Sequence, residues 1–258
     1  MAKVYSWEFD VRSYELDVNG PVNRAVYNNY LEETATRASA DVGYNYQWYF
    51  EQHRAWVVRE LTLRYLHPLL HGDRVRARTW VSDFRRIYSH REYDLRRVAD
   101  DLPVFRGRAK WVYVNLETMR PERIPAEFEA VFDPEPVPEP VAVDLVDPVS
   151  LEDAPCFSST RRVQQYEIDP AGHVNNGVYI NWFEQAQYDV LAAVGWSVDR
   201  LQTADLGLAW VGHRIGYLRP AMAGMPLTIT SQPVAYNGKQ WAWQHTIQDY
   251  LKRPRMAA

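Results

Sequence analysis

Two segments of this chain repeat each other at a distance of 152 residues. Residues 14–32 and residues 166–184 are identical at ten of nineteen positions. The same offset aligns five further pairs, namely Gly43 with Gly195, Tyr65 with Tyr217, Leu66 with Leu218, Pro68 with Pro220 and Gly72 with Gly224. One register held over about sixty residues predicts two fused copies of one unit, because a solenoid needs at least three shorter repeats.

Each copy has the same expected order of elements. A β-rich opening leads through a turn with Asp and Gly into a helix, over residues 24–42 in the first copy and 176–194 in the second. The second helix is apolar on most sides, which indicates a buried helix. Alternating segments follow in the first copy, at residues 56–66, 74–81, 87–98 and 104–114. This order predicts an α+β fold, in which an antiparallel sheet wraps around a long central helix.

We expect the first unit to span residues 1–124, a linker to span 125–156 and the second unit to span 157–258. The linker holds seven prolines and many acids, so we expect neither a regular helix nor a central strand there. In the second copy the segment 240–251 is followed only by KRPRMAA, which leaves no room for a full last strand. Because sheet edges need covering, the two copies should pair side by side as a homodimer would.

Composition excludes several classes of protein. The single Cys156 allows no internal disulfide, and no closely spaced set of Cys and His offers four metal ligands, so we expect no metal and no cofactor. The first residues lack the apolar core of a signal peptide, and no run of about 18 apolar residues occurs. The sequence therefore predicts a cytoplasmic protein without membrane contact. A homodimer of this chain is compatible with these features.

Charge is distributed unevenly, although the net charge is only -4. Thirteen Arg and no Lys lie between Arg54 and Arg108, against seven acids. One interpretation is the solvent face of a half-buried sheet. The other is a guanidinium-rich surface for coenzyme A or an acyl carrier protein, with Arg85 and Arg86 in a turn that meets phosphates. Nucleic acid is not expected as a partner, because the chain is not basic overall.

The turn before each helix is where the two copies differ most informatively. Asp17 and Asp169 correspond, and the Asn at the end of each turn has the composition of a helix cap. His173, by contrast, has Pro21 as its counterpart. A scaffold would not need an imidazole in one copy only, so His173 indicates function, with a surface histidine as the alternative.

A carboxylate on this turn places a base beside the amides of a helix N-terminus. The amides that we expect to stabilise an oxyanion belong to Gly172, Asn176 and Gly177. Such an arrangement suits thioester hydrolysis, in which the carboxylate deprotonates a water or attacks the carbonyl itself. No Gly-x-Ser-x-Gly segment is present, and Cys156 lies in the expected linker.

Residues 169–184, DPAGHVNNGVYINWFE, resemble the signature of hotdog-fold thioesterases, between the 4-hydroxybenzoyl-CoA thioesterase group and the acyl-acyl carrier protein (acyl-ACP) thioesterases. The fused double unit favours the latter family, and the resemblance implies a tandem hotdog fold that hydrolyses fatty-acyl thioesters without a cofactor. It also implies catalytic roles for Asp169, His173 and Asn175.

Three positions depart from the family pattern or extend it. Some members use an Asn two residues after the Asp, where this chain has Ala171 and, in the first copy, Asn19. Plant-type enzymes place a Glu on a later strand, whereas this chain reads GHRIGYLRP. Glu184 is a candidate second carboxylate, but its counterpart Glu32 favours a structural role. We therefore expect one competent site at Asp169 and a degenerate one at Asp17.

Two other functions stay open. One is a hotdog hydratase or dehydratase, in which an acid and a His add or remove water beside a thioester; the V-N-N-G-V-Y segment and the helix Glu fit thioesterases better. The other is a silent module that binds acyl thioesters, because such a module would keep every fold-defining residue.

Overall fold

Two compact units divide the chain. The computed structural model describes residues 3–145, 147–151, 153–249 and 253–257. The first unit combines Met1–Val143 with Val211–Arg214, and the second combines Asp144–Trp210 with Ile215–Ala258. Each unit contains an antiparallel sheet and one long helix, which confirms the predicted α+β class. Among the described residues, no helix has both the length and the apolar character that crossing a bilayer requires.

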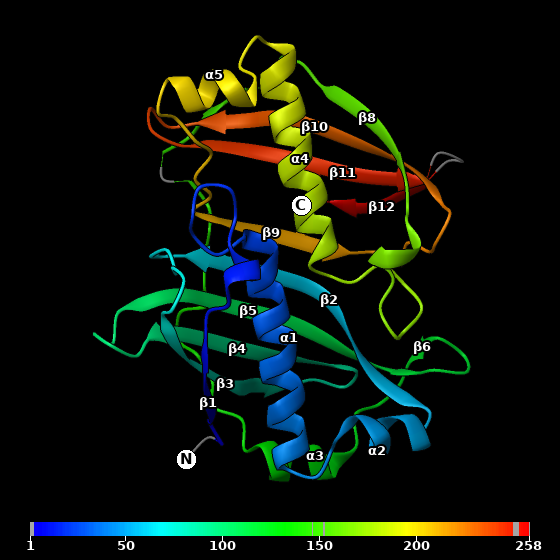
Figure 1. The fold of residues 1–258 in the computed structure, drawn as a ribbon. Helices are drawn as coiled ribbons and strands as arrows, with labels where there is room; N and C mark the ends of the chain where they lie inside the picture. Colours follow the sequence, from blue (N-terminus) through cyan, green and yellow to red (C-terminus); the bar gives the residue numbers. More distant parts are fainter. Residues whose placement is uncertain (1–2, 146, 152, 250–252, 258) are drawn as a thin grey trace. The chain divides into compact units, whose positions relative to one another are not determined.

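The sheet of the first unit has the strand order β1–β3–β4–β5–β2, and β6 pairs with β5. Helix α1 (Arg24–Asp41) crosses one face of this sheet, as Figure 1 shows, and buries Tyr27, Tyr30 and Leu31. The other elements are β1 (Tyr5–Asp10), η1 (Ser13–Glu15), α2 (Tyr46–Glu51), β2 (Arg54–Tyr65), β3 (Arg74–Phe84), β4 (Tyr88–Arg97), β5 (Pro103–Asn115), β6 (Arg120–Pro121) and α3 (Ala126–Phe132).

The second unit repeats this order as β8–β10–β11–β12–β9, with β7 pairing with β10. Helix α4 (Val178–Ala193) crosses its sheet in Figure 1 and buries Ile180, Trp182 and Phe183. The other elements are β7 (Val149–Ser150), β8 (Phe157–Arg162), η2 (Gln165–Glu167), α5 (Val198–Thr203), β9 (Gly212–Tyr217), β10 (Pro226–Tyr236), β11 (Trp241–Asp249) and β12 (Arg253–Ala257).

The repeat extends further in the structure than identical residues do in the sequence. On β3 and β4 of the first unit, Thr79 lies opposite Tyr93. On β10 and β11 of the second, Ser231 lies opposite His245, which is the same pairing displaced by 152 residues. The two copies therefore share strand register, although their side chains have diverged.

A short last strand is present in the second unit, where the sequence predicted no room for a full one. Strand β12 has five residues, against thirteen in the corresponding β5. It pairs with β11 on one side and β9 on the other. The sequence pattern missed it because these two neighbours supply the backbone partners, whatever the local strand propensity.

The predicted linker was wrong at its start, where helix α3 lies. Phe128 and Phe132 are buried against a cluster that includes Val81 and Tyr113. Pro125 stands immediately before the helix, where its missing N–H costs nothing. Two aromatic side chains four residues apart thus outweigh the proline-rich composition.

The chain after α3 stays with the first unit. The Glu135 N–H donates to the Val81 carbonyl at 3.0 Å, and Arg64 Nη1 donates to the Ala142 carbonyl at 3.1 Å. Arg64 points away from α1, because its neighbour Tyr65 contacts Tyr27 of that helix. Residues 133–143 therefore run from β3 to β2 across the side of the sheet that α1 does not cover.

Candidate active site

The turns before α1 and α4 have the same backbone hydrogen bonds. In the second unit the Asp169 N–H donates to the His173 carbonyl at 2.9 Å, and the Gly172 N–H donates to the Asp169 carbonyl at 2.9 Å. The first unit repeats both bonds around Asp17, at 2.7 and 3.1 Å. The glycine of each turn has a positive φ, of +83° at Gly172 and +103° at Gly20, which other residues adopt only with strain.

The carboxylate of Asp169 folds back onto its own turn. It accepts the Ala171 N–H at 2.9 Å, and its Oδ2 lies 3.3 Å from His173 Nδ1. The Asp169 side chain is only 13% exposed, whereas that of His173 is 27% exposed. Asp17 likewise accepts the Asn19 N–H, at 2.7 Å, but Pro21 supplies no imidazole. One of two otherwise matching turns therefore carries an Asp–His pair.

The surroundings of His173 determine where its proton lies. Nδ1 faces the Asp169 carboxylate and, at 3.2 Å, the Val174 carbonyl. Both neighbours are acceptors, so Nδ1 carries the hydrogen, by assignment from the hydrogen-bond network. In the neutral ring Nε2 then keeps its lone pair, which makes it a proton acceptor.

Asn175 stabilises the turn that leads into α4, whose N-cap is Gly177. Its Oδ1 accepts the Gly177 N–H at 2.9 Å, and its own N–H donates to the Glu167 carbonyl at 3.0 Å. Asn23 makes the same two contacts in the first unit, with Ala25 and Glu15, both at 2.8 Å. Asn23 is the N-cap of α1, as predicted, and Asn175 makes the matching contacts just before α4. A catalytic role for Asn175 stays a prediction.

Two of the three predicted oxyanion donors are already occupied. The Gly172 N–H donates to the Asp169 carbonyl, and the Gly177 N–H donates to Asn175. We therefore withdraw these two amides as oxyanion donors. The carbonyl of Asn176 accepts the Tyr217 hydroxyl at 3.3 Å, and its amide stays a prediction. Glu184 lies half-buried along α4, and its counterpart Glu32 is exposed on α1.

A buried carboxylate that was not predicted from the sequence lies two residues before Asp169. Glu167 is 6% exposed and accepts the Gln164 N–H at 2.8 Å and the Trp182 indole N–H at 2.9 Å. It also forms an ion pair with Arg161 of β8, whose guanidinium lies 4.1 Å from the centre of the Trp182 ring. Glu167 thus joins β8, the turn that holds Asp169, and α4 at one point.

Glu15 does the same in the first unit with different partners. It accepts the Arg12 N–H at 2.8 Å, Arg12 Nη1 at 2.7 Å and the Tyr30 hydroxyl at 2.7 Å. Burial opposes ionisation of Glu15, but these hydrogen bonds outweigh it and lower the pKa of the carboxyl. The signal was available, since a Tyr–Glu pair opens both repeated segments.

A Ser–His contact in the second unit is structural. Ser231 Oγ lies 2.8 Å from His245 Nδ1, and Gln187 Nε2 lies 3.3 Å from His245 Nε2. The Trp210 N–H donates to Gln187 Oε1 at 2.8 Å, so the Gln187 amide turns its NH2 group to the imidazole. Nδ1 of His245 therefore carries the hydrogen and cannot take a proton from Ser231, which excludes this serine as an activated nucleophile in the neutral state.

This network predicts acid sensitivity. Burial lowers the pKa of His245 to about 4, from an ordinary value of 6.5. The fold thus favours the neutral ring. Its contribution to the unfolding free energy is complete above pH 6.5 and is lost as the pH falls from 6.5 to 4. The loss should approach ~3 kcal/mol of unfolding free energy. We expect urea unfolding midpoints to fall over this range, and less steeply for His245→Phe; equal slopes would contradict the assignment.

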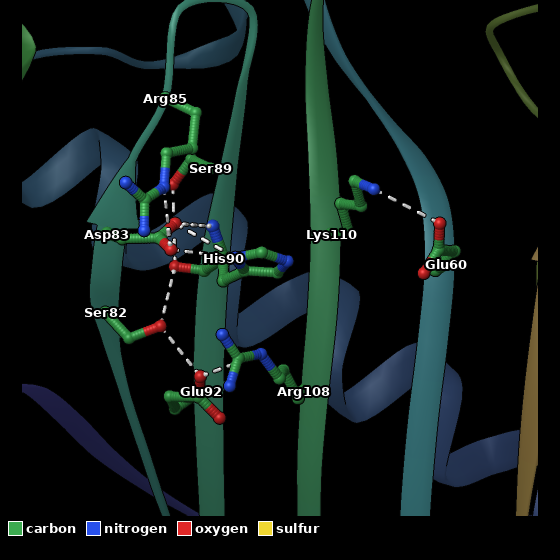
Figure 2. Close-up of polar contacts among 9 residues, drawn as sticks. All are labelled: Glu60, Ser82, Asp83, Arg85, Ser89, His90, Glu92, Arg108 and Lys110. Carbon is green, nitrogen blue, oxygen red and sulfur yellow. Dashed lines mark hydrogen bonds and ion pairs between the residues drawn. The ribbon is translucent and has the colours of Figure 1, made fainter. Parts of the chain in front are cut away.

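The arginine-rich run lies largely among carboxylates. Figure 2 shows part of it on β2 to β5, where Glu92 accepts from Ser82 at 2.7 Å with Arg108 at 3.4 Å. Burial raises the pKa of Glu92, and these two partners oppose the shift. Other pairs are Arg74 with Glu8, Arg76 with Glu8, Arg96 with Asp94, and Arg97 with Asp100. These contacts favour the solvated-face interpretation of the run.

The two arginines predicted to bind phosphates are exposed. Arg85 Nε lies 3.5 Å from Asp83, a contact drawn in Figure 2. Asp83 also contacts His90 Nδ1 at 2.9 Å, which lowers the Asp83 pKa against the effect of burial. The Arg86 carbonyl accepts the Ile124 N–H at 3.0 Å. Phosphate binding at this turn stays a prediction. Within the described residues, no three His, Cys, Asp or Glu side chains gather as metal ligands would.

Two models of known protein families match this chain. A family model described as the acyl-ACP thioesterase N-terminal domain matches residues 2–132, which is half of the chain. The chain belongs to the acyl-ACP thioesterase family. A second family model, described as the thioesterase-like superfamily, matches residues 163–256 of the chain.

Several curated relatives of this family member are plant proteins. Oleoyl-acyl carrier protein thioesterase 2, chloroplastic, from Arabidopsis thaliana is 28% identical over 193 residues, covering 69% of this chain and 52% of the relative. Acyl-acyl carrier protein thioesterase ATL3, chloroplastic, from the same plant is 31% identical over 134 residues, covering 51% of this chain and 69% of the relative. The chain thus spans about half the length of the oleoyl relative.

Solved structures confirm the fold of this family member. A structure from Lactobacillus plantarum whose title describes an oleoyl thioesterase superposes with a TM-score of 0.79 at 20% identity, covering 99% of this chain and 94% of the other. The predicted tandem hotdog fold, with an antiparallel sheet and a central helix in each unit, is therefore confirmed.

Proposed function

We propose that this acyl-ACP thioesterase family member hydrolyses fatty-acyl thioesters at Asp169. The observation that carries the proposal is the 3.3 Å contact between Asp169 and His173, in one of two turns whose backbone is otherwise the same. A folding role would serve both copies equally. The imidazole that stands in one copy only therefore supports a chemical role.

The arrangement suits general-base hydrolysis. His173 Nε2 has a lone pair because Nδ1–H faces Asp169, and the carboxylate stabilises the imidazolium that forms. A water transfers one proton to Nε2 while its oxygen attacks the thioester carbonyl carbon. The tetrahedral intermediate then breaks its C–S bond, and the departing thiolate takes the proton from the imidazolium. The alternative is direct attack of the Asp169 carboxylate on the carbonyl, which gives an anhydride that water opens.

Acyl-ACP is the proposed substrate class, with acyl-CoA as the second. The names of the plant relatives state that they act on acyl carrier protein thioesters, and the family match supports the same chemistry here. Both substrates end in the same phosphopantetheine thioester, so the reacting bond does not distinguish them. Exposed Arg85 and Arg86 are the residues that we propose for phosphate contact.

Thiol release tests the proposal directly. Purified protein is incubated with lauroyl-, palmitoyl- and oleoyl-ACP and the matching CoA esters, and free thiol is followed with a colorimetric reagent. We expect saturable release with at least one chain length. No release from any ester would overturn the proposal, and hydration of an enoyl thioester or binding without turnover would then identify the hydratase or the silent module.

We propose that the protein acts in the cytoplasm, in keeping with a single cysteine and no need for a disulfide. Two fused hotdog units provide the paired arrangement that a homodimer of single units would provide. A homodimer of the whole chain is a separate proposal, and sedimentation equilibrium would test it. Asn175 and Glu184 remain proposed contributors beside Asp169.

A further inference from the structure

The loop between β9 and β10, residues 218–225, lies against the turn that holds Asp169. The Val174 N–H, next to His173, donates to the Ala221 carbonyl at 2.9 Å. The loop and the turn both belong to the second unit. A partner that docks on this loop therefore lies beside the Asp–His pair.

Two exposed arginines stand on this surface. Arg219 lies on the loop, and Arg162 is the last residue of β8. Arg162 Nη1 donates to the Gly224 carbonyl at 2.6 Å, a neutral acceptor that leaves the positive charge in place. The carboxylate of Glu167 is held by Arg161 instead. Across the described residues, neither exposed guanidinium has a carboxylate within ion-pair distance.

The first unit differs in charge at both corresponding positions. Displaced by 152 residues, Asp10 corresponds to Arg162, and His67 corresponds to Arg219. Asp10 Oδ1 lies 3.6 Å from Arg74 Nη1, so the charge at this position is already paired. The copy that carries the imidazole beside its turn is therefore also the copy that carries these two exposed positive charges.

Exposed apolar side chains surround the two arginines. Leu218 is 44% exposed and Met222 is 40% exposed, both on the loop, and Tyr166 of η2 is 85% exposed. Tyr14 and Leu70 are exposed at matching positions of the first unit, so apolar exposure is common to both copies. The arginines are what distinguishes the second unit. Apolar contacts combined with charged groups at the rim are typical of protein–protein interfaces.

This combination fits an acidic protein better than a small anion. A guanidinium binds carboxylates and phosphates equally well through its fork of N–H groups. A small phosphate ester would use the charges and leave the apolar side chains in water. An acidic protein surface would cover both, and the exposed positive charges would steer its approach.

We propose that this surface of the second unit docks the acidic protein that carries the acyl chain. Its members are Arg162, Tyr166, Leu218, Arg219 and Met222. The inference rests on the proposed function, in which acyl-ACP is the substrate class. It adds where the carrier docks, and it assigns Arg219 to the binding of the carrier rather than to the chemical step.

Steady-state kinetics with three thioesters of the preferred acyl chain test the surface. Acyl-ACP, acyl-CoA and the acyl N-acetylcysteamine thioester share the reacting bond, but only the first has a protein and the last has no charge. We expect Arg219→Glu to raise KM for acyl-ACP about tenfold with little change in kcat, since a charge at an interface rim acts on association. Its kcat/KM for the neutral thioester should stay within about twofold of the wild type. Added salt should lower the wild-type kcat/KM for acyl-ACP.

Lys239→Glu is the matched control. It makes the same charge reversal at an exposed residue of the same unit, in the turn at the other end of β10, about 30 Å along the strand. We expect a wild-type KM for acyl-ACP. Equal effects of the two variants would reduce the result to net charge and overturn the surface. Equal losses of Arg219→Glu with acyl-ACP and acyl-CoA would mean phosphate binding, and equal losses with all three thioesters a structural role; either would overturn it.

Binding without turnover separates docking from hydrolysis. Holo-ACP, which has the phosphopantetheine arm but no acyl chain, is titrated into the full chain by calorimetry. We expect the wild type and Asp169→Asn to bind alike, and Arg219→Glu to bind about tenfold more weakly, about 1.4 kcal/mol. Weaker binding by Arg219→Glu, with no thiol release by the wild type, would uphold the surface and overturn the proposed hydrolysis. Equal binding by Arg219→Glu and an active wild type would do the reverse.

Discussion

Asp169→Asn is expected to reduce thiol release from the preferred acyl thioester by about 10²–10⁴-fold, the range for a general acid–base group. The amide cannot stabilise the imidazolium, and its NH2 group would face the Nδ1–H of His173, which disfavours the tautomer with a free Nε2. Stability should change little, since the side chain lies on a turn. Initial rates over a range of substrate concentrations measure the change in kcat.

Asp17→Asn is the matched control for this experiment. It removes the same carboxylate from a turn with the same backbone hydrogen bonds, so any general effect on the fold should be similar. We expect its rate to stay close to that of the wild type. Equal losses in the two variants would mean that the turn acts structurally, and would contradict a single competent site.

His173→Gln separates the two chemical routes. If Nε2 takes the proton from water, this variant should lose as much activity as Asp169→Asn. If Asp169 attacks the carbonyl itself, His173→Gln should keep a substantial part of the activity that Asp169→Asn loses. Trapping with hydroxylamine distinguishes them further, because an anhydride intermediate gives a hydroxamate on the protein.

Glu167→Gln is expected to lower kcat by about 10²-fold, the scale of a misplacement of about 1 Å at a reacting group. Glutamine keeps the shape of the side chain but loses the charge that pairs with Arg161. Its NH2 group also replaces one acceptor oxygen, so a donor can face the Trp182 N–H. The turn that holds Asp169 is then free to shift relative to α4. KM should change less than kcat, because the substrate does not need Glu167 to bind.

Glu15→Gln is the control for Glu167. Both variants should lose about 2 kcal/mol of unfolding free energy, the scale of a hydrogen bond to a charged group. Only Glu167→Gln should also have a lower kcat, because Glu15 supports the turn of Asp17, which has no histidine. Glu167→Asp should restore part of the rate by restoring the charge. Loss of kcat in proportion to stability in both variants would leave Glu167 a purely structural residue.

Much of the turn around Asp169 could be predicted from sequence because its determinants are local. Gly172 needs the left-handed conformation, Asn175 accepts the Gly177 N–H just before the helix, and His173 reaches Asp169 within the same turn. Each contact spans only a few residues. The predicted oxyanion role of Gly172 and Gly177 was wrong, since the turn itself uses both of their amides.

The sequence by itself determined the duplication, the class of fold and the turn position where an imidazole stands in one copy only, because repeats, periodicity and turn composition act over short distances. Only the tertiary structure decided which groups are buried together. Glu167 meets Trp182 fifteen residues away, α3 forms because the core accepts Phe128 and Phe132, and β12 forms between β11 and β9.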